Sequence, residues 1–426
     1  MYADADRLDA YGFAGWIGPE PHGRNPRNSA SSAAIGVSGR DETYVEETTE
    51  LIEALDRQRL AEREAQPWLI VASFVNPHDI VLYGALTAHL PAFRFAVDPM
   101  PEVPPSPTFD EPLHTKPRCQ ASYRDLYPYA FQPILDEPFY RKLYYQLQKN
   151  ADQQIARVLE ALTRSSFYDN TIVVFTSDHG ELLGAHGGLR QKWYCAYEEM
   201  LHVPFIIHNR RLFPQPQQCH ALTSHVDLMP TLLGLANADA EAIRERLRSK
   251  FSEARSLVGR DLSAVIREPD RVSLPDEPIY FMSDDDVTRG LHQCNALGMP
   301  YPSVAQPNHV ETIIMTVTHN SKKQRWKLSR YFDPTQFWSC PGVSDTASSP
   351  VGPAYGPVRC WNVSVKTKPA EDEFELYNLS DDPLETVNLA HPSCATPTTI
   401  AIQRHMMALL AAQRKHKRLQ PATYHT

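Results

Sequence analysis

Long hydrophobic runs are missing from this sequence of 426 residues. No stretch approaches the about 20 consecutive apolar residues that a helix needs to span a bilayer. The first residues, Met1-Tyr2-Ala3-Asp4, are neither basic nor apolar, so they do not resemble a secretory signal peptide. We therefore expect no membrane contact, and we expect the protein to lie in the cytoplasm.

Cysteine is sparse, and no two of the 7 cysteines have the Cys-x-x-Cys spacing of a zinc ribbon or a thioredoxin motif. Basic residues are outnumbered, because 42 Lys and Arg face 51 Asp and Glu and leave a net charge of −9. This balance argues against a general nucleic-acid binder. A basic stretch at 414–418 leaves that alternative open, although we expect it to complement the C-terminal end of a helix.

Glycine is half as frequent as proline, with 18 Gly against 36 Pro. This excess of proline indicates long ordered loops rather than flexible linkers. Eleven of the prolines lie between residues 91 and 138. We predict a long surface loop there, and loops of such length are often functional. The loop is a candidate wall of a substrate pocket.

The middle of the chain alternates helical and strand patterns. Apolar residues recur every three or four positions from Phe139 to Leu162, which predicts an amphipathic helix with Asp136 as its N-cap. Short apolar runs at 68–74, 171–176 and 203–207 predict buried strands. Such alternation favours an α/β/α sandwich around a mainly parallel central sheet.

The pattern changes after about residue 264. Runs at 280–282, 312–317 and 326–328 predict shorter antiparallel strands, and residues 400–410 predict a terminal helix. We therefore predict two domains. Residues 1–264 form an α/β domain, and residues 265–426 form a smaller α+β subdomain with an antiparallel sheet.

Two candidate metal ligands, Asp178 and His179, follow the apolar run at 171–176. Ligands bind outside the carboxyl ends of strands in parallel α/β sheets. Two ligands do not complete a site, because Ca²⁺ takes six or more oxygens. For an isolated Asp-His pair we favour the alternative, in which Asp178 caps a helix and His179 packs in the core.

The wider sequence changes this interpretation. The segment 171–207 contains SDHGE, LLGAHG, a lysine, YEE and VPFII in that order, and it resembles the sulfatase family of the alkaline phosphatase superfamily. The segments 73–79, 225–231, 326–328 and 375–385 resemble further motifs of that family, in the family's order. Several collinear motifs are more specific than any one of them.

The resemblance implies a role for four residues. Asp178 and His179 match a pair of metal ligands, so the expected cofactor is one divalent ion, with Ca²⁺ favoured and Mn²⁺ or Mg²⁺ as alternatives. Lys192 matches the lysine that contacts the transferring group. His78 matches a histidine that binds the ester or leaving-group oxygen. A metal ion, an ammonium and an imidazole can all stabilise the negative charge that ester cleavage builds.

The resemblance also implies the activity. It predicts a metal-dependent, arylsulfatase-like hydrolase of small-molecule sulfate esters. The family more often has Asp-Asn where this chain has Asp178-His179, a pair that resembles the phosphonate monoester hydrolase branch. A phosphonate monoester or phosphodiester hydrolase and a non-catalytic binding protein therefore remain alternatives. We expect no nucleic-acid or membrane partner, and a homo-oligomer is left open.

Two motifs of the family are missing upstream of Leu8. Family members open with a strand that ends in Asp-Asp, and a nucleophile then follows in Cys/Ser-x-Pro/Ala-x-Arg, where it is converted to formylglycine. Neither the Cys119 nor the Cys340 segment matches that motif. If the polypeptide is complete as given, we expect weak metal binding and little or no turnover. The alternative is that the missing parts lie upstream.

Several polar residues near these motifs are expected to have supporting roles. His186 falls within the family's Gly-Asp-His-Gly position, and we expect it to support the site at most. Glu198 and Glu199 are expected to cap or brace the following helix. Asp227 is expected to be structural, and residues 284–286 are expected to form a solvated acidic turn.

Overall fold

The computed structural model describes two compact units that interleave along the chain. The first unit comprises Met1–Pro107, Tyr127–Asp178 and Pro204–Gln215, and the second comprises Thr108–Leu126, His179–Val203 and Pro216–Thr426. The predicted division at residue 264 stays a prediction. The described residues are 8, 12–13, 40–62, 66–91, 93, 95–213, 215–251, 253–268, 271–272, 274, 276–286, 295, 298–299, 301, 303–319, 321–334, 349–351, 359–361 and 368–418.

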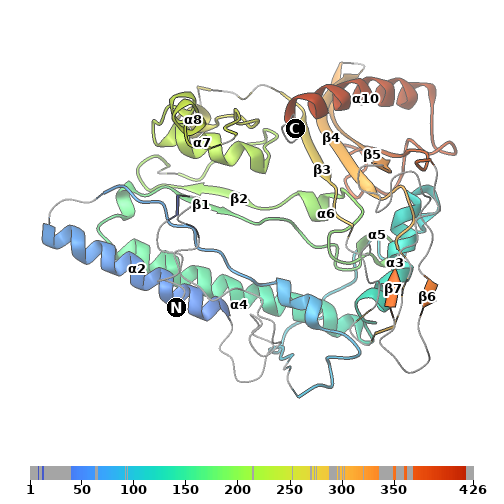
Figure 1. Ribbon diagram of the computed structural model, residues 1–426, viewed down its shortest axis with the longest axis horizontal. Coiled ribbons are helices and arrows are strands. Elements are labelled where there is room, and N and C mark those ends of the chain that lie inside the picture. The colour runs from blue at the N-terminus through green and yellow to red at the C-terminus, as the bar shows by residue number, and fades with distance from the viewer. Residues whose placement is uncertain are drawn as a thin grey trace. The chain divides into compact units, whose positions relative to one another are not determined.

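Two long helices, α2 (Arg40–Glu62) and α4 (Glu137–Arg164), pack side by side in the first unit (Figure 1). The predicted start of α4 is confirmed, because Asp136 accepts a hydrogen bond of 2.9 Å from the backbone N–H of Phe139. Ile52 and Leu162 lie in one buried cluster between the helices. Their apolar stripes therefore form the core of this unit, as the helical spacing predicts.

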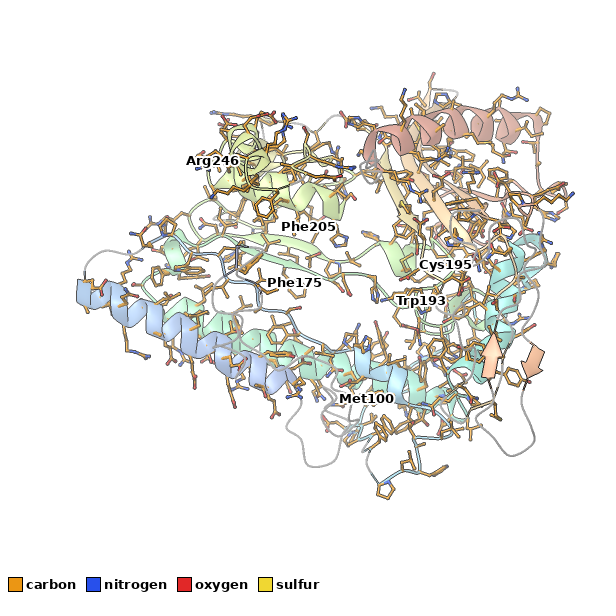
Figure 2. All side chains as sticks on the ribbon, viewed as in Figure 1. Met100, Phe175, Trp193, Cys195, Phe205 and Arg246 are labelled. Carbon is orange, nitrogen blue, oxygen red and sulfur yellow. The ribbon has the colours of Figure 1, made fainter. Side chains whose placement is uncertain are left out.

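The strands β1 (Val173–Thr176) and β2 (Phe205–His208) pair antiparallel, with Val173 opposite His208. The parallel pairing expected for these two runs is therefore wrong. Full burial is wrong too, because Phe175 is 37% exposed and Ile206 is 56% exposed; Figure 2 shows the side chains of Phe175 and Phe205 on this pair. An apolar run indicates a strand, but it does not encode the direction of the neighbouring strand.

The predicted buried strand at 68–74 is also wrong. Residues 66–75 run as irregular chain without a strand ladder. Leu69 is 61% exposed and Val71 is 67% exposed, whereas Trp68 and Ile70 pack against the cluster of Ile52 and Leu162. The run therefore buries alternate side chains. Its exposed positions are also apolar, so the sequence shows the same unbroken apolar run as a fully buried strand.

The proline-rich region is not one continuous loop. The helix α3 (Arg118–Ala130) interrupts it and contains Pro128. Cys119, Tyr123, Leu126 and Tyr127 are all nearly fully buried. These four residues have the three- and four-residue spacing of a helix, so the signal was present in the sequence but was outweighed by the density of proline around it.

The second unit contains the predicted antiparallel sheet, with strand order β3-β4-β5-β8 (Figure 1). The terminal helix α10 (Pro397–Lys417) lies over this sheet and packs Met406 against Ile313 and Leu376, all of which are fully buried. The antiparallel sheet and the terminal helix were both predicted, and both are confirmed. The strands are β3 (Ile279–Ser283), β4 (His309–His319), β5 (Lys322–Phe332) and β8 (Glu373–Asn378).

Asp227 is structural, as predicted. Its side chain is buried, accepts the backbone N–H of Ser224 at 3.1 Å and pairs with Arg260 at 3.0 Å. It closes the capping box in front of α7 (Leu228–Leu235). The other described elements are η3 (His78–Leu82), η4 (Leu113–Thr115), η5 (Tyr168–Asn170), α5 (Ala185–Gly188), α6 (Glu198–Leu201), η6 (His225–Asp227), α8 (Ala240–Arg248), α9 (Ser263–Arg267), β6 (Ser349–Val351) and β7 (Arg359–Trp361).

The basic end of α10 makes ion pairs within the second unit. Arg414 donates from Nε to Oε2 of the buried Glu311 at 2.7 Å, and Arg418 pairs with Asp284 at 2.6 Å. The acidic turn at 284–286 was expected to be solvated, and this is wrong, because Asp286 also accepts a hydrogen bond from Tyr194. The Cys340 segment lies outside the described residues. Among the helices that the structure describes, none is long and apolar enough to cross a membrane.

Candidate active site

The candidate ligands Asp178 and His179 follow β1 directly. Asp178 is exposed and belongs to the first unit, whereas His179 is half-buried and opens a segment of the second unit. His179 Nδ1 lies 2.8 Å from the carbonyl oxygen of Gly180. A carbonyl oxygen can only accept, so Nδ1 carries the proton and Nε2 presents its lone pair. Such a contact sets the tautomer of many metal-binding histidines.

Gly180 permits the close packing of this turn. A Cβ atom at position 180 would lie 1.9 Å from the backbone oxygen of Glu199. The backbone N–H of Gly180 donates to the carbonyl of Met200 at 2.8 Å. The chain after His179 is therefore fixed against the α6 segment by a contact that only glycine can make without displacement.

Lys192 and His179 are brought together within the second unit. Lys192 Nζ is in hydrogen-bond contact with His179 Nε2. It also lies 5.2 Å from the centre of the Trp193 ring, in a segment where Trp193 and Cys195 are marked in Figure 2. An ammonium group donates to the imidazole lone pair, which agrees with the tautomer that Gly180 sets. The same lone pair is the one that a metal ion binds.

A closed loop separates these two residues. The side chain of Glu181 accepts the backbone N–H groups of Leu183 at 3.1 Å and Gln191 at 2.6 Å. Leu182 N–H donates to the carbonyl of Gln191 at 3.0 Å. Burial raises the pKa of Glu181, although the two backbone hydrogen bonds act in the opposite direction. The loop from Leu182 to Gln191 thus starts and ends beside the candidate residues.

His78 lies in the first unit, where it is the first residue of η3 and is exposed. The segment before it is anchored by Asp41, a buried residue of α2. Asp41 accepts the backbone N–H of Val75 at 2.6 Å and that of Asn76 at 3.1 Å. Asp41 was not predicted from the sequence. Its signal was weak, because an aspartate in the first turn of a helix is common for reasons of the helix dipole alone.

The metal-ligand set in the described ranges is incomplete. No cluster of three or more His, Cys, Asp and Glu side chains that could hold a metal ion occurs there. Asp178 and His179 have the right chemistry for a divalent ion, but two ligands fall short of the six or more that Ca²⁺ takes. Asp178 and His179 therefore stay candidate ligands, and the residues that the structure describes do not complete a metal site.

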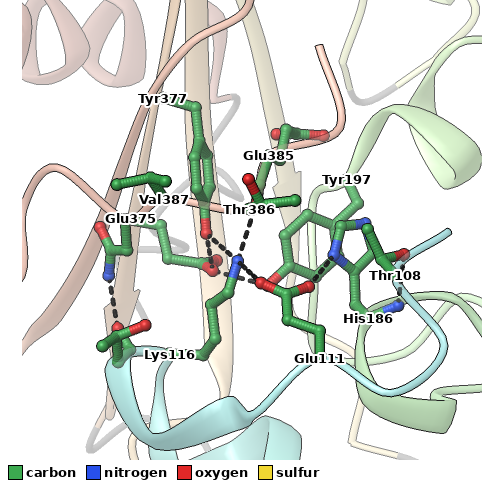
Figure 3. A network of polar contacts seen from close by, with 12 residues as sticks. Thr108, Glu111, Lys116, His186, Tyr197, Glu375, Tyr377, Glu385, Thr386 and Val387 are labelled. Atoms are coloured by element: carbon green, nitrogen blue, oxygen red, sulfur yellow. Dashed lines mark hydrogen bonds and ion pairs between the residues drawn. The ribbon is translucent and has the colours of Figure 1, made fainter. Parts of the chain in front are cut away.

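His186 is completely buried rather than peripheral. Its Nδ1 lies 3.0 Å from Glu111 (Figure 3), and its Nε2 lies 3.1 Å from Glu199. Glu198 pairs with Lys327 at 2.6 Å. Glu198 and Glu199 therefore brace α6 through these side-chain contacts, which is the second of the two roles predicted for them.

The first residues of the C-terminal motif at 375–385 and its last residue, Glu385, are buried in the core, whereas Ser380, Asp381, Pro383 and Leu384 are exposed. Glu375 accepts hydrogen bonds from the hydroxyl groups of Tyr197, Tyr331 and Tyr377, at 2.5 to 2.7 Å. Lys116 donates to the Tyr377 hydroxyl at 2.8 Å (Figure 3). Burial first, and then the neighbouring Glu375, raise the pKa of all three tyrosines well above the usual value. These phenols stay protonated and hold the network together.

Comparisons with known proteins agree with these motifs. A family model described as Sulfatase matches residues 5–238, which is more than half of the chain. The sulfatase YidJ of Escherichia coli (strain K12) is 30% identical over 221 residues, covering 52% of this chain and 41% of YidJ. The choline-sulfatase of Rhizobium meliloti (strain 1021) is 27% identical over 183 residues, covering 42% of this chain and 33% of that enzyme.

The fold agrees as well. A solved sulfatase structure from Bacteroides thetaiotaomicron VPI-5482 superposes with a TM-score of 0.57 at 20% sequence identity, covering 95% of this chain and 69% of that one. In the two sequence comparisons, the matched stretch is less than half the length of the relative. The family model, which matches more than half of the chain, and the collinear motifs lead to one conclusion: this chain belongs to the sulfatase family.

Proposed function

We propose that this protein hydrolyses small-molecule sulfate esters with a divalent metal ion, and that Asp178, His179, Lys192 and His78 take part. The single observation that carries the proposal is the contact between Lys192 Nζ and His179 Nε2. It joins the candidate sulfuryl-binding cation and a candidate metal ligand at the two ends of one closed loop.

Lys192 is proposed to bind the sulfuryl group. Cleavage of the ester increases negative charge on the nonbridging and leaving oxygens. A fixed ammonium can stabilise that charge without reorganising solvent, and such groups typically contribute factors of about 100 or more in rate. His78 is proposed to donate a hydrogen bond to the ester or leaving-group oxygen, which its position on an exposed turn allows.

Asp178 and His179 are proposed to supply two ligands of the metal site. The hydrogen bond from His179 Nδ1 to the Gly180 carbonyl leaves Nε2 for coordination, and a metal ion bound there would replace the hydrogen bond that Nε2 accepts from Lys192. The bound ion would add positive charge beside the sulfuryl oxygens. We favour Ca²⁺ because of the family resemblance, with Mn²⁺ and Mg²⁺ as alternatives. Metal binding is tested by titrating Ca²⁺, Mn²⁺ and Mg²⁺ calorimetrically into the wild type and His179→Ala.

The names of two relatives support the proposed substrate class. The matched proteins include a choline-sulfatase and the iduronate 2-sulfatase of Homo sapiens, whose names refer to sulfates of choline and iduronate. We propose a small sulfate ester as the substrate here. The pair Asp178-His179 makes phosphonate monoesters the second candidate class.

The two classes are separated by one assay. We expect 4-nitrophenyl sulfate to be hydrolysed faster than 4-nitrophenyl phenylphosphonate by the purified protein. A faster reaction with the phosphonate would contradict the sulfatase assignment and favour the second class. Absence of turnover, together with binding of a sulfate ester that Lys192→Ala abolishes, would show a non-catalytic binding protein.

A further inference from the structure

His186 is a buried histidine between two carboxylates. Its side chain has no exposed surface, and its ring nitrogens lie 3.0 Å from Glu111, as Figure 3 shows, and 3.1 Å from Glu199. The imidazole ring stacks on Tyr197, with 3.6 Å between the ring centres. Both nitrogens are therefore within hydrogen-bond distance of an anion, and one ring face is covered by an aromatic side chain.

This geometry determines the protonation state of the ring. An ionised carboxylate can only accept hydrogen bonds, so each nitrogen must carry a proton to satisfy its partner. A neutral imidazole would turn one lone pair toward a carboxylate. Burial alone would lower the pKa of His186, but the hydrogen bonds to Glu111 and Glu199 outweigh it and raise the pKa.

The groups that face His186 come from two segments. Glu111 and Lys116 lie before α3, Glu199 belongs to α6, and Tyr197 precedes α6. Lys116 is fully buried and pairs with Glu111 at 2.9 Å, so its positive charge opposes protonation of the ring. Two carboxylates face one ammonium, and an imidazolium makes the cluster neutral. This balance is the electrostatic reason for a charged histidine whose own side chain has no exposed surface.

The same residue sits at the tip of the loop that ends at Lys192. The backbone N–H of His186 donates to Thr108 Oγ1 at 2.9 Å, and that of Gly187 donates to the Thr108 carbonyl at 2.8 Å. Glu181 and Gln191 close the base of the loop. The loop is thus held at its base by a carboxylate and at its tip by Thr108 and the His186 side chain.

We propose that His186 is a positioning residue that acts as an imidazolium: its two charge-assisted hydrogen bonds to Glu111 and Glu199 fix the loop from Leu182 to Gln191 and thereby hold Lys192 in place. The role of Lys192 in ester cleavage rests on the proposed function. The protonated state of His186 and its effect on Lys192 do not depend on turnover.

The protonation state is tested by NMR on ¹⁵N-histidine-labelled protein at neutral pH. We expect both ring nitrogens of His186 to carry protons, with the signals assigned from their loss in His186→Gln. His202→Gln is the matched control, because the His202 side chain is 80% exposed on the same segment. A single ring N–H on His186 at neutral pH would overturn the proposal.

The positioning role is tested by the acetylation rate of Lys192, measured by mass spectrometry relative to the exposed Lys415. We expect His186→Gln to raise this ratio about tenfold, which corresponds to about 1.4 kcal/mol and matches the loss of a hydrogen bond to a charged group. Loss of overall fold alone would raise the labelling of all buried lysines, including Lys327. An unchanged Lys192 ratio in a folded variant would refute the role.

A second variant, Glu111→Gln, tests the proposal if His186→Gln does not fold. Glu111→Gln leaves the histidine in place and removes one of its two anions. We expect the His186 pKa to fall and the Lys192 ratio to rise in this variant, whereas His202→Gln leaves both unchanged. Failure of the protein to hydrolyse any sulfate ester would count against the proposed function but would leave these two measurements intact.

Discussion

The Lys327 ammonium lies 2.9 Å from the Glu385 carboxylate, and each side chain is only 1% exposed. Lys327 also pairs with Glu198 and donates to the Ala196 carbonyl at 2.9 Å. Removing one partner of a buried pair leaves an uncompensated charge, which costs about 3–5 kcal/mol. We expect Lys327→Met to lower the free energy of unfolding by about that amount.

Denaturant unfolding checks this prediction, with Arg248→Met as the control because the Arg248–Glu245 pair is exposed. The control is expected to change stability by less than about 1 kcal/mol. The double variant Lys327→Met/Glu385→Leu should recover part of the loss, since it removes both charges. Equal losses in Lys327→Met and in the control would contradict a structural role for the pair.

Glu385 gives stability an unusual pH dependence. Burial raises its pKa to about 7, against the attraction of Lys327, from an ordinary value of 4.5. Between these two values the folded state binds a proton that the unfolded state has lost. The contribution of Glu385 to stability therefore falls as pH rises from 4.5 to about 7. The unfolding free energy of the wild type should therefore fall relative to that of Glu385→Gln as pH rises across this window.

His186 predicts a second pH effect at higher pH. Its pKa is raised above the ordinary value of 6.5, so its contribution to stability is fully present below pH 6.5 and is lost as pH rises through the folded-state pKa. We expect the stability difference between the wild type and His186→Gln to shrink with rising pH in that range. A difference that does not vary with pH would show that the ring is neutral throughout.

Asp41 is expected to order the segment that carries His78. Asp41→Asn loses one of two acceptor oxygens for the Val75 and Asn76 N–H groups, which should cost about 1–2 kcal/mol. Hydrogen exchange measured by mass spectrometry should quicken in peptides covering residues 73–79. Glu42→Gln is the control, because Glu42 is the exposed neighbour on the same helix turn. Equal exchange in both variants would argue against the anchor.

Alanine substitutions at Gly180 and Gly188 compare a tightly packed glycine with an open one in the segment after His179. A Cβ at position 180 would collide with the Glu199 backbone, whereas one at position 188 meets no atom within 4 Å. Overpacking against backbone costs up to about 3 kcal/mol, and alanine at the φ of +87° of Gly188 costs about 1 kcal/mol. Thermal unfolding of Gly180→Ala and Gly188→Ala should show this order, and the reverse order would contradict the packing described here.

The sequence predicted the elements that local pattern determines. The helix α4 with its Asp136 cap follows from residues a few positions apart. The antiparallel strands β4 and β5 follow from short apolar runs, and α10 follows from its spacing.

Contacts between distant residues could not be predicted in this way. Glu111 lies 75 positions before His186, and Lys116 lies 269 positions before Glu385, whose carbonyl it contacts. The direction of β2 against β1 also depends on where the chain returns to the sheet. No local pattern encodes these pairings, because only the folded chain brings the partners together.

Lys192 is the residue on which the assignment of a sulfate ester hydrolase can be tested most directly. We propose measuring kcat/KM for 4-nitrophenyl sulfate with the wild type, Lys192→Ala and the control Lys415→Ala. We expect Lys192→Ala to lower kcat/KM by about 100-fold or more, because a charge that stabilises the transition state is lost, and we expect Lys415→Ala to leave it unchanged. Wild-type turnover in Lys192→Ala would contradict the role of this lysine in ester hydrolysis.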